Sequence, residues 1–102
     1  MEMWFSEFHT PDVKHSIRVN RQLFSRQSDY QRIDIFETPE FGRVLTLGGN
    51  VMLTERDEFI YDEMITHVPM AIHKEAKEIM VIGAGDGGVV RELTRYDRVR
   101  HI

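Results

Sequence analysis

The first half of the chain alternates between apolar and polar positions, a period typical of half-buried β-strands. The alternation is interrupted by two short turns, 38–42 with proline and glycine and 48–50 with two glycines. Strands joined by tight turns predict an antiparallel β-meander. The open edges of such a sheet favour pairing with a second copy of the chain. The strands expected from the alternation are residues 15–23, 30–37, 43–47 and 51–54.

The segments beside these strands lack the alternation. Residues 1–14 carry Trp4, Phe5 and Phe8, and we interpret them as an irregular aromatic arm that packs on another element or subunit. Residues 24–29 are mainly polar and are predicted to be a linker between two strands.

Gln31 falls on the same strand face as Ile33 and Ile35 if the strand is regular. A glutamine on an apolar face needs a hydrogen-bond partner or a wet site. The alternative is that Gln31 lies at the strand end, in solvent. The residue by itself leaves both interpretations open.

A helix is predicted after the last strand. Thr54 with an acidic residue at Asp57 matches the spacing of a capping box, although Asp57 could equally be the cap. We expect the helix to run to Val68, where Pro69 breaks or kinks it. Its predicted buried stripe consists of Phe59, Ile60, Met64, Ile65 and Val68.

Two neighbouring residues of this helix are candidates for binding a cation. Tyr61 lies on the apolar side and Asp62 at its margin. A phenol ring and a carboxylate so placed can together hold an ammonium group. On spacing alone, the favoured interpretation of the pair is a core tyrosine beside a solvated acid.

The strongest local signal is a glycine-rich turn between a predicted strand and a predicted helix. The continuous apolar run 79–82 is typical of a strand buried on both faces of a parallel sheet. Gly83, Gly85 and Gly88 follow in the spacing G-x-G-x-x-G, and apolar residues then recur at helical spacing. A strand, a glycine turn and a helix N-terminus in this order favour a nucleotide-type ligand over a purely structural turn.

Asp86 lies inside this glycine turn. A carboxylate there repels a pyrophosphate and attracts a cation, which favours a sulfonium nucleoside or an amine over a dinucleotide. The alternative is structural, because aspartate is a preferred N-cap and Asp86 precedes the predicted helix.

Composition narrows the classes of function. The chain has 102 residues, 13 basic and 17 acidic side chains and a net charge of −4. Because the basic residues are not clustered, nucleic-acid binding is disfavoured. The absence of cysteine excludes disulfides and cysteine-based zinc sites, and His67 and His73 have no spacing typical of metal ligands. Without a membrane-length apolar run or a signal peptide, we expect a cytoplasmic protein.

The predicted fold class is α/β. An antiparallel β domain is expected over residues 1–55, and the start of a Rossmann-like nucleoside-binding domain over residues 56–102. A ribose-binding acid is normally found about 20 positions beyond the glycine turn, and one strand–helix unit cannot bury both faces of a parallel sheet. We therefore expect the chain to be an N-terminal piece of a longer protein.

Several of these segments, in the same order, resemble the spermidine synthase family of polyamine aminopropyltransferases. The matching stretches are residues 54–64, His67-Val68-Pro69 and the Gly83–Gly88 turn, together with Tyr30-Gln31, Phe41-Gly42 and Leu47-Gly48-Gly49. The resemblance implies transfer of an aminopropyl group from decarboxylated S-adenosylmethionine to putrescine, which releases methylthioadenosine. It implies a homodimer or homotetramer, a co-substrate in place of a cofactor, and no metal.

The resemblance also implies roles for single residues. Gln31 corresponds to a glutamine that contacts the nucleoside, Tyr61 to a tyrosine that lines the amine site, and Asp86 to the aspartate that holds the charged aminopropyl group or amine. Asp62 stands where the family usually has histidine or glutamine, which leaves the preferred amine open. The general base is expected beyond Ile102, so the chain alone is expected to be inactive.

Two other classes of function remain open. A methyltransferase that uses S-adenosylmethionine has the same glycine turn, and its pocket needs a partner for the donor's carboxylate. A non-catalytic β module that self-associates would account for the first half of the chain alone.

Overall fold

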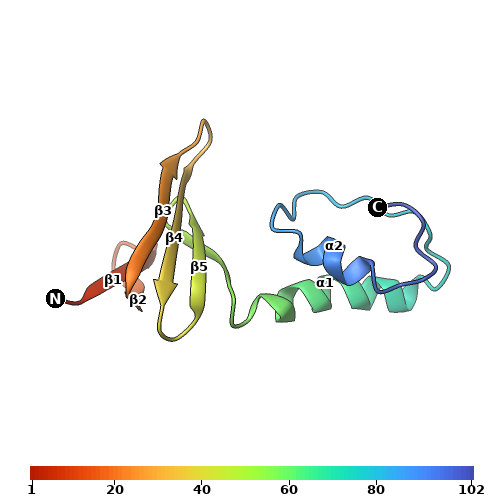
Figure 1. Cartoon of the computed structure of the whole chain (residues 1–102), viewed down its shortest axis with the longest axis horizontal. Helices are drawn as coiled ribbons and strands as arrows, with labels where there is room; N and C mark the ends of the chain where they lie inside the picture. Colours follow the sequence, from red (N-terminus) through yellow and green to blue (C-terminus); the bar gives the residue numbers. More distant parts are fainter. The chain divides into compact units, whose positions relative to one another are not determined.

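The computed structural model describes all residues from 1 to 102, and it divides into two units, Met1–Asp57 and Glu58–Ile102. The first unit contains the six strands of the chain and the second contains its two helices (Figure 1).

The centre of the first unit is a four-stranded antiparallel sheet with the order β3-β4-β5-β6, which confirms the predicted meander from residue 21 onward, whereas residues 15–19 belong to a separate two-stranded sheet. The turns between its strands use glycines with positive φ: Gly42 at 71°, and Gly48 and Gly49 at 59° and 82°. These left-handed conformations are open to glycine at little steric cost. The strands are β3 (Arg21–Gln27), β4 (Arg32–Thr38), β5 (Gly42–Leu47) and β6 (Asn50–Thr54).

The aromatic N-terminal segment is a regular strand, so the prediction of an irregular arm is wrong. β1 (Met3–Thr10) pairs with β2 (Val13–Val19) in an antiparallel hairpin. The predicted strand 15–23 is two strands separated at Asn20, and most of the predicted linker 24–29 belongs to β3. Every residue of β3 is exposed, which explains why the strand has no alternating apolar pattern to reveal it.

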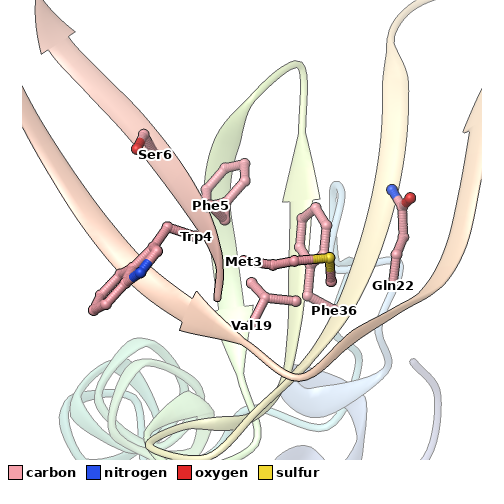
Figure 2. A pocket seen from close by; sticks show the side chains of 7 residues that line it. All are labelled: Met3, Trp4, Phe5, Ser6, Val19, Gln22 and Phe36. Carbon is pink, nitrogen blue, oxygen red and sulfur yellow. The ribbon is translucent and has the colours of Figure 1, made fainter. Parts of the chain in front are cut away.

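The core of the first unit is small. Ile17, Val19 and Val44 are its buried aliphatic side chains, and the rings of Phe5 and Phe36 lie 5.1 Å apart. A hollow of about 400 Å³ lies in this region, and Figure 2 shows the side chains that line it. Its lining consists of Met3, Trp4, Phe5, Ser6, Val19, Gln22 and Phe36.

The second unit consists of α1 (Glu58–Ile72), α2 (Gly88–Leu93) and the segments that follow them. α1 begins directly after Asp57 and continues through Pro69 to Ile72. The predicted end of the helix at Val68 is therefore wrong. The Thr54 hydroxyl donates a hydrogen bond to the Asp57 carboxylate. Neither helix is long and apolar enough to cross a membrane.

The face of α1 that is buried differs from the predicted apolar stripe. Asp62, Thr66 and Met70 are its buried residues, and they follow one another at four-residue spacing on a single face. α1 packs on α2, so this polar face is the covered one. The five residues of the predicted stripe are all between 46% and 61% exposed: Phe59, Ile60, Met64, Ile65 and Val68.

The apolar run 79–82 is not a strand in this structure, contrary to the prediction. Met80 and Ile82 are 83% and 91% exposed. The run is preceded by a single parallel bridge between Glu78 and His101, in which the Ile79 backbone N–H donates to the His101 carbonyl at 3.0 Å. A strand buried on both faces needs neighbouring strands and covering helices, and one bridge does not supply them.

Candidate ligand-binding site

The glycine turn leads into α2 through a left-handed residue. Gly87 is the N-cap residue, with φ 83°, and no side chain caps this helix. The structural alternative, in which Asp86 caps the helix, is therefore wrong. Gly83 and Ala84 also have positive φ, at 90° and 55°. Asp86 is exposed and available to contact a ligand.

Three carboxylates from α1 and the glycine turn meet in one cluster. Glu58, Asp62 and Asp86 each offer an oxygen atom, and these atoms lie within 4.8 Å of one another. Asp62 is only 3% exposed, so the prediction of a residue at the margin of the apolar stripe is wrong, as is the alternative of a solvated acid. Its Oδ2 atom is buried and has no hydrogen-bond partner.

The absence of a side chain at Gly88 explains how the Asp62 carboxylate is accommodated. A Cβ atom added at Gly88 would lie 2.0 Å from Asp62 Oδ2 and 2.5 Å from its Cγ. The last glycine of the motif therefore allows the carboxylate to lie against the first residue of α2. This is a close approach of the kind that only glycine permits.

The pKa values of two carboxyl groups in the cluster are shifted in opposite directions. Burial raises the pKa of Asp62 to about 6, and the neighbouring carboxylates of Glu58 and Asp86 act in the same direction. Hydrogen bonds from Arg91 lower the pKa of Glu58, because the guanidinium donates to both carboxylate oxygens at 3.0 and 3.1 Å. The cluster thus contains a firmly ionised Glu58 beside an Asp62 that ionises near pH 6.

A second buried acid was not predicted from the sequence. Glu92 on α2 is 1% exposed, and its carboxylate lies 2.8 Å from Arg95 Nε and 3.8 Å from His67 Nε2. The other ring nitrogen of His67 lies 2.6 Å from the Tyr96 hydroxyl. The i,i+3 spacing of Glu92 and Arg95 was the only sequence signal for this network.

The remaining predicted site residues lie outside the acidic cluster. Tyr61 is 67% exposed on α1, which excludes the interpretation as a core tyrosine. Gln31 belongs to the first unit, in an exposed turn before β4, where its backbone N–H donates to the Ser28 hydroxyl at 3.0 Å. This is the strand-end position that was one of its two interpretations. Of the predicted substrate-binding residues, the structure brings Asp62 and Asp86 together.

Comparison with known protein families matches both halves of the chain. Residues 3–55 match the family model described as "Spermidine synthase tetramerisation domain". Residues 58–102 match the one described as "Spermine/spermidine synthase domain". The limits of the two matches lie close to the division between the two structural units.

Curated relatives and solved structures resemble the chain over almost its whole length. The polyamine aminopropyltransferases of Lachnoclostridium phytofermentans and Clostridium botulinum are each 60% identical to it over 102 residues, which is 36% of each relative. The spermidine synthase from Thermotoga maritima superposes with a TM-score of 0.91 at 46% identity, covering 97% of this chain and 35% of that one. A spermidine synthase in complex with the transition state analogue AdoDATO gives the same score and identity, and 34% of that chain is covered. The chain thus spans about a third of the length of these proteins.

Proposed function

Because the chain belongs to the spermine/spermidine synthase family, we propose that it forms part of a polyamine aminopropyltransferase. The proposed reaction transfers the aminopropyl group of decarboxylated S-adenosylmethionine to putrescine. The observation that carries this proposal is the pairing of Asp62 and Asp86 at the glycine turn. Both reactants are cations, and two carboxylates beside a turn that suits a nucleoside are chemically matched to them.

The proposed reaction is a single displacement. The putrescine nitrogen attacks the carbon next to the sulfonium, a C–N bond forms and the C–S bond breaks. The electron pair of the broken bond goes to sulfur, which leaves as the neutral thioether of methylthioadenosine. Because the sulfonium is already a good leaving group, the mechanism calls for neither a metal nor a nucleophilic side chain. Its main demand is alignment of the two reactants.

The carboxylates have two opposed effects on the attacking amine. They hold its ammonium form, and by doing so they favour the protonated state. The amine must lose a proton before it attacks, so a general base is required nearby. We assign Asp62 and Asp86 to binding and assign no residue of this chain as the base.

We further propose that residues 78–102 form the first strand–helix–strand unit of a Rossmann-like domain. The parallel bridge between Glu78 and His101 supports this, because the two bridged residues flank α2 in sequence as a crossover connection requires. The glycine turn then lies at the carboxyl end of the first strand, where such folds bind nucleosides. Gly83, Gly85 and Gly88 would let the nucleoside approach the backbone.

The first unit is proposed to join copies of the chain. Its matching family is named for tetramerisation, and its hairpin exposes Trp4, Phe8 and Val13 by 55%, 61% and 55%. We expect sedimentation to show the 102-residue chain at a multiple of its 12.0 kDa mass. A chain that is monomeric at all concentrations would contradict this assignment, but it would have no bearing on the proposed reaction.

The experiment for the proposed activity uses a chimera, in which this chain replaces the matching 102 residues of the Lachnoclostridium phytofermentans relative. We expect the chimera to form spermidine from putrescine and the decarboxylated donor, and the chain alone to show no turnover. An inactive but folded chimera, beside an active relative, would contradict the proposal. Tighter binding of intact S-adenosylmethionine than of the decarboxylated donor would favour the methyltransferase alternative.

A further inference from the structure

Arg91 on α2 lies between the acids of both helices. Its guanidinium holds Glu58 with two hydrogen bonds, and its Nη2 lies 3.8 Å from Asp62 Oδ2. The same nitrogen lies 3.8 Å from Glu92 Oε1. The Arg91 side chain is 47% exposed.

Of the three acids in the cluster, Asp62 has the least support for its negative charge. It is faced by Glu58 from α1, by Asp86 from the glycine turn and by Arg91 from α2. Glu58 has the bidentate pair and Asp86 is solvated, whereas Asp62 Oδ2 is buried without a hydrogen-bond partner. Among the groups that face Asp62, Arg91 is the one that favours its charged form.

We propose that Arg91 is a positioning residue for the amine site, which neutralises Glu58 and keeps Asp62 ionised so that Asp62 and Asp86 receive the cation as an anionic pair. This inference rests on the proposed function, because it assumes that a cationic amine is the ligand. The unpartnered, buried Asp62 oxygen is the independent sign of a ligand, since a buried acceptor normally has a donor. An alkylammonium supplies that donor together with the missing positive charge.

The inference gives a defined pH dependence. The pKa of Asp62 is raised to about 6, chiefly by burial, so the anionic pair is complete above that pH and is lost as pH falls through it. An adjacent cation lowers a carboxyl pKa by about 1 to 3 units, and Arg91 is the weakest of the influences on Asp62, so we expect its removal to raise the pKa of Asp62 by about 1 unit, the lower end of that range. A shift of about 1 unit lowers the ionised fraction of Asp62 near pH 6 about fivefold, and we expect the KM for putrescine to rise by the same factor, with kcat less affected.

Four variants test the role of the charge. Arg91→Gln removes the guanidinium, and Arg91→Lys keeps a positive charge. Arg95→Gln is the matched control, because Arg95 follows α2 and pairs with Glu92 instead. Glu58→Gln combined with Arg91→Gln removes one charge of each sign and should return Asp62 towards its original titration.

Two measurements test the effect of these variants on Asp62 and on substrate binding. Carbon-13 NMR of the 102-residue chain follows the titration of the Asp62 carboxyl group, and the KM for putrescine is measured in the chimera on both sides of the Asp62 transition. In Arg91→Gln we expect the Asp62 titration, and with it the pH at which the KM for putrescine changes, to move to higher pH. Both should move little in Arg91→Lys or Arg95→Gln, and both should lie close to the parent values in the double variant. An Asp62 titration that is unchanged in Arg91→Gln, or equally shifted in the double variant, would overturn the inference.

The two measurements also separate this inference from the proposed function. A titration that shifts without any change in KM would overturn the role of Arg91 in the amine site and the assignment of Asp62 with it. An inactive wild-type chimera would count against the proposed function, whereas the NMR titration would still report whether Arg91 controls Asp62.

Discussion

Gly88→Ala is expected to lower the free energy of unfolding of the second unit by about 2 to 3 kcal/mol, the upper part of the range of about 1 to 3 kcal/mol for inserting a methyl group into a packed site. The added Cβ would lie 2.0 Å from Asp62 Oδ2 and 2.9 Å from Oδ1. Asp62 is short and almost fully buried, so it can avoid the methyl group only by moving its carboxylate away from Glu58 and Asp86. We therefore expect the KM for putrescine in the chimera to rise as well.

Gly85→Ala is the matched control for this steric effect. It belongs to the same motif, has no positive φ, and an added methyl group there would meet no atom within 4 Å, so a change below about 1 kcal/mol is expected. Thermal unfolding of both variants measures the difference. In a double-mutant cycle, Asp62→Ala should relieve much of the cost of Gly88→Ala, because it removes the group that clashes. Equal stability of Gly88→Ala and the parent chain would mean that the close approach does not exist.

Asp86→Asn in the chimera is expected to lose most of its turnover, with kcat/KM reduced roughly 10- to 100-fold, the worth of a hydrogen bond to a charged group. The substitution keeps the size of the side chain and removes the charge that attracts the cationic reactant. Since Asp86 is exposed and does not cap α2, the melting temperature should stay close to the parent value.

Asp97→Asn is the control for the change in net charge, because Asp97 is also exposed in the second unit and lies outside the acidic cluster. Its kinetics should match those of the parent chimera. Steady-state rates with putrescine and the decarboxylated donor give the comparison. Kinetics of Asp86→Asn that equal those of the control would remove Asp86 from the site.

The β-meander could be predicted because its strands are half-buried and therefore alternate. The same rule failed at β3, which is exposed along its whole length, and at β1, where the aromatic residues obscured the period. The turns were predicted from Gly42, Gly48 and Gly49. These positions have positive φ values, which glycine adopts without steric cost, so glycine in the sequence marks such turns.

The predicted buried stripe of α1 failed for a different reason. Periodicity shows which face of a helix is apolar, and it assumes that this face is the one covered. In this structure α2 covers the face with Asp62 and Thr66, so a polar face is buried and the apolar face is exposed. Contacts between segments far apart in the sequence decide this outcome, and the local pattern does not contain them.

The candidate site was predicted in part. The glycine spacing and Asp86 were visible because the motif is local. Glu58 and Asp62 are four residues apart on one helix face, a signal that was available. Arg91 could not be assigned, because its link to Glu58 spans 33 positions in the sequence. The burial of Glu92 depends on the same packing of α2 against α1.

The Glu92 network also constrains how this segment can diverge among relatives. The buried carboxylate is accompanied by Arg91, Arg95 and His67, and the loss of one cation leaves a buried anion with less compensation. Substitution of Glu92 alone leaves Arg95 without its acid. Evolutionary change at these positions therefore has to proceed in concert, and a homologue that has replaced Glu92 with an apolar residue should carry altered residues at the cationic positions too.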